Sequence, residues 1–376
     1  MGAGSTGVAA GRAHHRRGGG VPPHRSGHRC ARHSRRPGAG RGRVPARPRR
    51  RGGPARDQPG PTGGRHPGLH SLDEVGGHLL RLRHTLAQAA EACGCRLAAT
   101  GSAPFTDRLP VPVTPTPRFR RMRRQAAVLA DEQLIDGMHV HVGVPDRGAG
   151  VAVLDGLRPW LPVLTALSAD SPLWRGRDTG FASWRTVVFD RWPVAGLPPH
   201  FADAADYDRR VRRLVEAGLI DDSGQVYWHA RLSERYPTVE VRAMDVQLRV
   251  DEAVLLVGPV RALATRALEQ PPSAEGDPPE FLRATAWHAA RHGAAGRLHD
   301  PLTGRLRSAR EVTDGLLTHL DAPLRATGDD RSTARLLERL HTEGNGAVRQ
   351  RREVRRGGRS GLIGLITGEA VGIQSA

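Results

Sequence analysis

Two stretches of the chain alternate between apolar side chains and polar or small ones, which is the pattern of a β-strand with one packed face. In residues 137–146, His139 and His141 occupy the polar positions, and the positions between them are apolar: Met138, Val140, Val142 and Val144. The two imidazoles therefore lie on one face, roughly 6.5–7 Å apart along the strand. They could converge on one metal ion or one anionic ligand, or they could be an ordinary pair of half-exposed histidines.

Residues 237–245 alternate in the same way. Glu240 and Arg242 project from the polar face, opposite three apolar side chains: Val239, Val241 and Ala243. One interpretation is an ion pair that satisfies itself. If this strand lies near the strand with the histidines, Glu240 becomes a candidate metal ligand and Arg242 a candidate clamp for phosphate or carboxylate.

Most of the remaining chain has apolar residues at spacings of three and four, which predicts amphipathic helices. The first begins after Ser71, a suitable N-cap. The predicted helices are residues 72–93, 118–132, 151–167, 203–218, 251–268, 280–291, 308–321 and 330–343, with short strands at 96–100 and 226–232.

Residues 168–199 are long, irregular and rich in tryptophan, phenylalanine and arginine, with Arg185 near their middle. Such a segment is either a covered loop with aromatic anchors or a loop that lines a substrate site, where arginine holds carboxylates or phosphates.

The net charge of +19 is concentrated in residues 1–68, which contain 16 arginines and one acid, Asp57. The segment also has 17 glycines and 9 prolines, and it has no Leu, Ile, Phe, Tyr or Trp, so it cannot form a core. It could be a disordered polycationic tail, a targeting peptide, or a sequence translated in a wrong reading frame. The chain never uses lysine, as a very GC-rich gene would dictate, and this favours the last of these.

Three regions follow from these patterns: the Arg/Gly/Pro-rich segment 1–68, a folded domain at 69–355, and a flexible C-terminal tail at 356–376. Three cysteines argue for a reducing compartment without disulfides, so we expect a cytoplasmic protein. The apolar run at 362–366 is far too short to span a bilayer, and we expect no membrane association.

Several segments resemble the carboxylate–amine ligases of the glutamate–cysteine ligase type 2 family (YbdK-like). They are residues 137–146, 157–162, 167–174 running into 178–185, 191–193, 237–242 and 344–351. The resemblance is colinear from about residue 71 to residue 352.

The resemblance implies an α+β fold like that of glutamine synthetase, a curved antiparallel sheet that forms a funnel with helices packed outside. It also implies ATP and Mg²⁺ as cofactors, and glutamate and cysteine, or a similar acid and amine, as substrates. A γ-glutamyl amide would form through an acyl phosphate. By resemblance, His139 or His141 and Glu240 bind metal, and Arg242 and Arg185 are catalytic. The nucleotide-binding residues would be Arg242, Asn345 and Arg349.

One departure from the family stands out. Members open with an acidic strand, roughly Gly-Val-Glu-Glu-Glu, and a second acidic strand follows; both supply metal-binding carboxylates. Residues 1–68 occupy that place with only Asp57. We therefore expect the N-terminal strands to be missing and the activity to be impaired. If no reading frame upstream of Ser71 encodes a Glu-rich strand, the wrong-frame hypothesis is refuted.

Two other functions compete with the ligase. In the first, a non-catalytic relative binds nucleic acid or acidic partners through its basic N-terminal arm, although the arm lacks aromatic residues for base stacking. In the second, a metal hydrolase uses His139 and His141, which is weaker because no further ligand stands at suitable spacing. Nucleic acid is thus an unlikely partner, and a homodimer is plausible.

Overall fold

The computed structural model describes residues 68–106, 116–271 and 277–372. Residues 1–67, which contain nearly all of the predicted Arg-rich segment, lie outside the described residues. The interpretation of that segment therefore stays a prediction.

An antiparallel sheet of three strands carries both alternating stretches. Its order is β1 (Gly137–Gly143), β7 (Thr238–Asp245) and β6 (Ala230–Leu232). The register pairs His141 with Glu240, so the two predicted polar faces coincide. An irregularity between Met138 and Val140 shifts the pairing by one residue. The strands predicted at 137–146 and 237–245 are confirmed, and they lie side by side.

Helices cover the apolar face of this sheet, where Val140, Val239 and Val241 are buried. Contacts join α4 (Arg147–Leu157) to β6, α5 (Leu161–Leu167) to β7, and α8 (Val250–Glu269) to α4. The apolar run Arg147–Leu167 is long enough to cross a membrane by length and composition alone, but 78% of its most apolar 18-residue window is buried inside the protein. It is therefore accounted for as part of the core.

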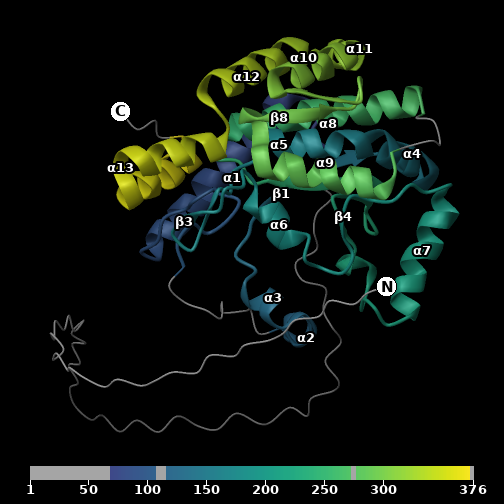
Figure 1. The fold of residues 1–376 in the computed structure, drawn as a ribbon, viewed down its shortest axis with the longest axis horizontal. Helices are drawn as coiled ribbons and strands as arrows, with labels where there is room; N and C mark the ends of the chain where they lie inside the picture. Colours follow the sequence, from purple (N-terminus) through teal and green to yellow (C-terminus); the bar gives the residue numbers. More distant parts are fainter. Residues whose placement is uncertain (1–67, 107–115, 272–276, 373–376) are drawn as a thin grey trace, which may run out of the picture. The chain divides into compact units, whose positions relative to one another are not determined.

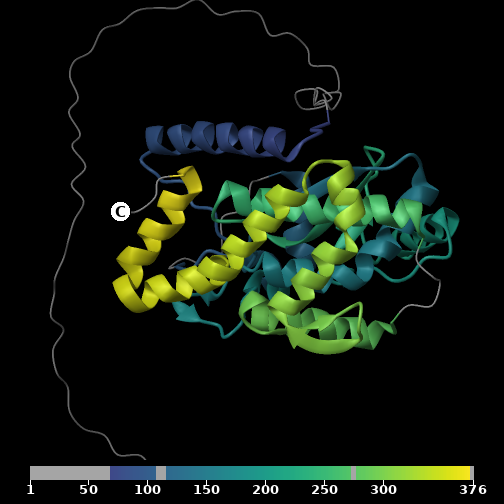
Figure 2. The ribbon, with the colours of Figure 1, turned by 90° about the horizontal axis from the view of Figure 1, so that it is seen from above.

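Further helices surround these elements. α9 (Pro279–His292) packs on α5, and α1 (Leu72–Ala92) packs on α8. Figure 1 shows α10, α11 and α12 together above this core, and Figure 2 shows the kinked C-terminal helix α13, whose end comes close to α1. The remaining helices are α2 (Pro117–Ala126), α3 (Val128–Asp131), α6 (Trp184–Phe189), α7 (Ala204–Glu216), α10 (Ala309–His319), α11 (Asp321–Ala326), α12 (Asp330–Glu343) and α13 (Gly346–Gly368).

Several predicted elements differ in detail. Residues 96–100 form no strand, and the helix predicted at 118–132 breaks at Ala127, whose φ is 48°. A hairpin of β8 (Arg297–Asp300) and β9 (Arg305–Ser308) was not predicted. Short pairs also occur: β2 (Leu173–Trp174) with β3 (Arg177–Asp178), and β4 (Ala195–Gly196) with β5 (Tyr227–Trp228).

The C-terminal region corrects an expectation. We expected a flexible tail from residue 356, but α13 continues to Gly368, with a kink at Gly358. Leu362 and Ile366 are buried against Leu173 and Leu248. This short apolar run therefore anchors the helix, because it covers an apolar patch that would otherwise be exposed.

The fold mixes helices and sheet, as expected for the α+β class. Within the described residues the largest sheet has three strands. The glutamine-synthetase-like funnel therefore stays a prediction.

Candidate functional site

The carboxylate of Glu240 lies at the centre of a polar cluster on the uncovered face of the sheet. Its Oε1 is 2.9 Å from Nδ1 of His139 and 3.8 Å from Nε2 of His141. The imidazole of His141 is held from its other side by Thr238, whose hydroxyl is 3.2 Å from Nδ1. The side chains of His139 and His141 are 36% and 42% exposed, so a ligand can reach both rings.

Two guanidiniums complete this cluster. Nη1 of Arg242 donates to Oε1 of Glu240 at 2.5 Å, and Nε of Arg231 donates to Oε2 at 2.9 Å. Arg231 also donates to backbone carbonyls of Ser223, Gly224 and Val226, which fixes its orientation. The Nε of Arg242 is buried and has no hydrogen-bond partner among the residues that the structure describes. Arg242 thus has one unpaired donor, which solvent does not reach. We call His139, His141, Arg231, Glu240 and Arg242 the open cluster.

The charges of the open cluster determine its protonation. Burial alone would raise the pKa of Glu240, but the hydrogen bond from His139 and the charges of Arg242 and Arg231 outweigh it and hold that pKa well below its ordinary value. Burial lowers the pKa of His141, and the nearby Glu240 carboxylate offsets this only in part. At neutral pH the cluster therefore presents a carboxylate beside an imidazole that is neutral.

The geometry permits a cation, but the chemistry does not suit magnesium. Ligand atoms of His139, His141 and Glu240 lie within 4.8 Å of one another. Mg²⁺ prefers oxygen ligands, and the described residues place one carboxylate here among two imidazoles and two guanidiniums. Both oxygens of that carboxylate already accept hydrogen bonds. The described residues alone therefore do not make a magnesium site.

Arg185 lies beneath the open cluster and is turned away from solvent. Only 3% of it is exposed; its Nη2 donates to the carbonyl of Arg242 at 2.9 Å, and its Nη1 lies 3.8 Å from Asp245. Gly137 is required here, because a Cβ at that position would collide with the guanidinium of Arg185. Phe189 covers both arginines, with its ring centre 5.2 Å from Arg185 and 5.9 Å from Arg242. Arg185 thus supports the strand that carries Arg242.

Asp245, at the other end of β7, has no exposed surface. It accepts hydrogen bonds from the hydroxyls of Ser171 and Ser183 and from the backbone of Asp170. Burial raises the pKa of Asp245, and it raises the pKa of Asp170 well above its ordinary value. We call Asp170, Ser171, Ser183, Arg185 and Asp245 the sealed cluster.

Asn345 and Arg349 are not brought to the open cluster by any described contact. Asn345 caps α13 and donates to the carbonyl of Ala166 at 3.0 Å. Arg349 is 6% exposed and pairs with Glu252 at 2.5 Å and Glu369 at 3.3 Å. The contact of Asn345 and Arg349 with nucleotide stays a prediction. The burial of both side chains argues against it.

The structure adds two residues that the sequence patterns did not reveal. Arg231 faces Glu240 across the β6–β7 pair. His229, two residues earlier, is 2% exposed and contacts Asp190 through Nε2 at 2.8 Å. The sequence predicted a strand at 226–232 that contains both residues, but the pairing of Arg231 with Glu240 depends on the register between two strands, which alternation within one strand does not give.

Comparison with known proteins agrees with the sequence resemblance. The model of glutamate–cysteine ligase family 2 (GCS2) matches residues 65–367. A Frankia alni protein with the provisional name glutamate–cysteine ligase 2-2 is 46% identical over 292 residues, which cover 77% of this chain and 76% of that protein. A Nocardia farcinica protein with the provisional name glutamate–cysteine ligase 2-1 is 46% identical over 286 residues, or 75% and 74% of the two chains.

Among solved structures, a bifunctional glutathione synthetase from Pasteurella multocida matches with a TM-score of 0.58 and 13% identity. The match covers 82% of this chain and 45% of that chain, so this chain spans less than half of that protein, and the likeness concerns the fold. The family model and the sequence relatives together show that the chain belongs to glutamate–cysteine ligase family 2.

Proposed function

We propose that the protein is an ATP-dependent carboxylate–amine ligase that joins glutamate to cysteine, or to a similar amine. Family membership supports a ligase that forms a carbon–nitrogen bond. The observation that carries the proposal for this site is the guanidinium of Arg242 next to Glu240 and two accessible imidazoles. Such an array suits an anion that develops charge during reaction.

The proposed reaction has two steps. A carboxylate oxygen of glutamate attacks the γ-phosphorus of ATP; the bond to the bridging oxygen breaks, and ADP leaves. The amine nitrogen then attacks the acyl carbon of the acyl phosphate and loses a proton, and the bond to the phosphate oxygen breaks. The products are an amide, ADP and phosphate. This chemistry depends mainly on positioning and on neutralisation of charge.

Each residue of the open cluster has a proposed role. Arg242 directs its guanidinium at a phosphate oxygen, while Arg231 holds Glu240 in place. His141, kept neutral by burial, accepts a hydrogen bond or a proton at Nε2. Arg185 positions the β7 backbone without touching substrate. A divalent cation, when bound, would neutralise phosphate charge, and it would need oxygen ligands beyond Glu240.

Trapping the acyl phosphate with hydroxylamine tests this proposal. The full chain is incubated with ATP, Mg²⁺, glutamate and hydroxylamine, and glutamyl hydroxamate is measured by mass spectrometry. A matched chimera replaces residues 1–67 with the N-terminal segment of the Frankia alni relative, which restores any acidic strands encoded there. A second reaction contains cysteine in place of hydroxylamine.

We expect hydroxamate and γ-glutamylcysteine from the chimera, and less or none from the chain itself. Equal product from both would show that the N-terminal segment is not limiting. If neither protein forms hydroxamate or amide, the ligase proposal is wrong.

A further inference from the structure

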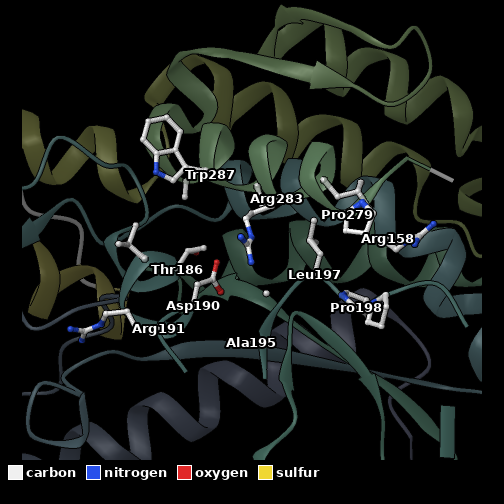
Figure 3. Close-up of a pocket in the computed structure, with 16 residues that line it drawn as sticks. Arg158, Thr186, Asp190, Arg191, Ala195, Leu197, Pro198, Pro279, Arg283 and Trp287 are labelled. Atoms are coloured by element: carbon white, nitrogen blue, oxygen red, sulfur yellow. The ribbon is translucent and has the colours of Figure 1, made fainter. Parts of the chain in front are cut away.

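Two histidines lie one turn apart at the C-terminal end of α9, outside the open cluster and the sealed cluster. The ring centres of His288 and His292 are 4.3 Å apart, and the ring planes are inclined by 44°. Residues four apart share one face of a helix, so the two imidazoles can bind one cation. Figure 3 shows Arg283 and Trp287 of α9 beside a cavity of about 450 Å³, whose lining includes neither histidine. The pair is therefore a separate feature of this helix.

A hydrogen bond determines which nitrogen of His288 is free to bind. Its Nε2 lies 2.8 Å from the carbonyl oxygen of Arg297. A carbonyl can only accept a hydrogen bond, so Nε2 carries the proton, and in the neutral ring Nδ1 then keeps the lone pair. Histidines that bind metal commonly donate their other N–H to a carbonyl in this way. His288 is thus held in the tautomer that a metal ligand needs.

The second imidazole is accessible. His292 is exposed, and its ring makes no hydrogen bond or ion pair with the residues that the structure describes. Partial burial lowers the pKa of His292, and the charges of His288 and Arg291 lower it further. The ring is therefore neutral at neutral pH, and a cation binds it without displacing a proton. Gly296 leaves room for this side chain, because a Cβ at residue 296 would lie 2.6 Å from the Cβ of His292.

The charges around the pair permit a cation. Arg291 donates to the carbonyl of Gly180 and lies over the ring of Phe181, 5.6 Å from its centre. Arg297 donates to the carbonyl of Leu306 at 2.6 Å. Both guanidiniums are therefore engaged by carbonyl groups of other segments. The last turn of an α-helix also carries a partial negative charge, which favours a cation there.

We propose that His288 and His292 together bind one divalent transition-metal ion of the copper, nickel and zinc type. Nitrogen ligands suit these cations, whereas Mg²⁺ prefers oxygen. Two nitrogens bound to one such cation at about 2.0–2.1 Å lie roughly 3 Å apart, which rings with centres 4.3 Å apart can reach by small rotations. Water fills the remaining coordination positions, so the site is open. It goes beyond the proposed ligase function, because it takes no part in that reaction.

A cation at this pair would stabilise the end of α9 that holds another part of the fold. The carbonyl of Ala290 accepts hydrogen bonds from the backbone nitrogens of Ala182 and Ser183, each at 2.9 Å. Ser183 belongs to the sealed cluster, so the last turn of α9 and that cluster are fixed to each other. An ion that binds only the folded arrangement of the two imidazoles stabilises it by mass action. Opening of the bonds to Ala290 should therefore become rarer when the metal is bound.

Footprinting of single histidines in the full chain tests the site, because it separates this pair from the other histidines of the protein. The chain is titrated with Ni²⁺ and treated briefly with diethyl pyrocarbonate, which modifies accessible imidazoles, and peptide mass spectrometry measures each modification. His84, exposed on α1 and without a histidine four residues away, is the internal control. We expect Ni²⁺ to protect His292 at concentrations at least about tenfold lower than those that protect His84. Mg²⁺ in place of Ni²⁺ should protect neither.

A substitution connects this protection to the pair. His288→Gln keeps an N–H that can donate to the carbonyl of Arg297, and it should raise the Ni²⁺ concentration that protects His292 by at least about tenfold. The matched control His84→Gln should leave that concentration unchanged. The proposal is overturned if Ni²⁺ protects His292 no better than His84, or if His288→Gln leaves the protection of His292 unaltered.

Hydrogen exchange tests the effect on the fold. Ni²⁺ should slow exchange of the backbone amides of Ala182 and Ser183 in the unsubstituted chain, and it should slow them much less in His288→Gln. If Ni²⁺ slows exchange of these amides equally in both proteins, or in neither, the stabilising role of the pair is refuted.

Discussion

Glu240 and Asp245 lie five residues apart on the same strand, and their surroundings differ sharply. Glu240 is bonded by two guanidiniums and an imidazole that solvent reaches. Asp245 has no exposed surface and is bonded by two hydroxyls and a backbone amide. Charged partners lower the pKa of Glu240 in spite of burial, whereas burial raises the pKa of Asp245 in spite of its partners.

The two surroundings suit different roles. The open cluster can contact a substrate, whereas the sealed cluster holds parts of the fold together. The open cluster has two imidazoles that solvent reaches, so it can engage a substrate anion. The sealed cluster ties α6 and the segment around Asp170 to the end of β7, and no ligand reaches it without unfolding the region. Substitutions in the first should therefore change activity, and substitutions in the second should change stability.

The largest effect on stability is expected at Arg349. Its burial and its ion pairs argue against the predicted contact with nucleotide. Arg349→Met would leave the nearby carboxylates of Glu252 and Glu369 without their buried partner. The free energy of unfolding should fall by about 3–5 kcal/mol. Urea denaturation measures this, with the exposed Arg305→Gln as control. If Arg349→Met has normal stability but binds ATP more weakly, Arg349 contacts the nucleotide and this prediction is wrong.

Asp245→Ala should lower the free energy of unfolding by about 3 kcal/mol, because it leaves several buried donors unsatisfied. Asp245→Asn keeps the shape and part of the acceptor capacity, so its loss should be smaller. Denaturation by urea distinguishes the two variants. If Asp245→Ala is as stable as the unsubstituted chain, the sealed cluster does not stabilise the fold as proposed.

Glu240→Gln should lower ATP-dependent hydroxamate formation by about 100-fold in the N-terminal chimera, because Arg242 and His139 lose the charge that orients them. The same substitution should also lower the free energy of unfolding, because Glu240 is only 5% exposed and the partners that hold its pKa below the ordinary value would lose the carboxylate charge. Full activity in Glu240→Gln would exclude the open cluster from catalysis.

The pH dependence of stability should differ in sign between the clusters. Glu240 has a depressed pKa when folded, so its contribution is present above its ordinary value of 4.5 and is lost as pH falls further. Asp170 has a raised pKa when folded, so stability is lost as pH rises above 3.8. Glu240→Gln should flatten the acid side of the stability profile, whereas Asp170→Asn should gain stability over the unsubstituted chain as pH increases. Chemical denaturation across the acid and neutral range measures both.

The sequence predicted the strands of the open cluster because their alternation is long enough to read. Four apolar positions in 137–146 and three in 237–245 fixed which side chains share a face, and the structure joins those faces in one sheet. Family resemblance correctly indicated the family, and the sequence predicted a strand at 226–232, but neither placed Arg231 opposite Glu240. A partner across a strand pair depends on register, which local patterns do not encode.

The role of the C-terminal arginines could not be predicted for another reason. A basic helix beginning at Gly346 looks solvated in the sequence, yet Arg349 meets carboxylates from α8 and from residues near the chain end. Such long-range pairing distinguishes a structural arginine from a ligand-binding one. Similarly, Leu362 and Ile366 anchor a helix where composition indicated a loose tail.

A crystal structure of the chain with bound ADP would test the central claim most directly. The account predicts that phosphate oxygens lie within hydrogen-bond distance of Arg242, on the face that presents His139 and His141, while Arg349 keeps its pairs with Glu252 and Glu369. If the phosphates bind elsewhere and Arg242 retains an unused donor, the open cluster is not the nucleotide site.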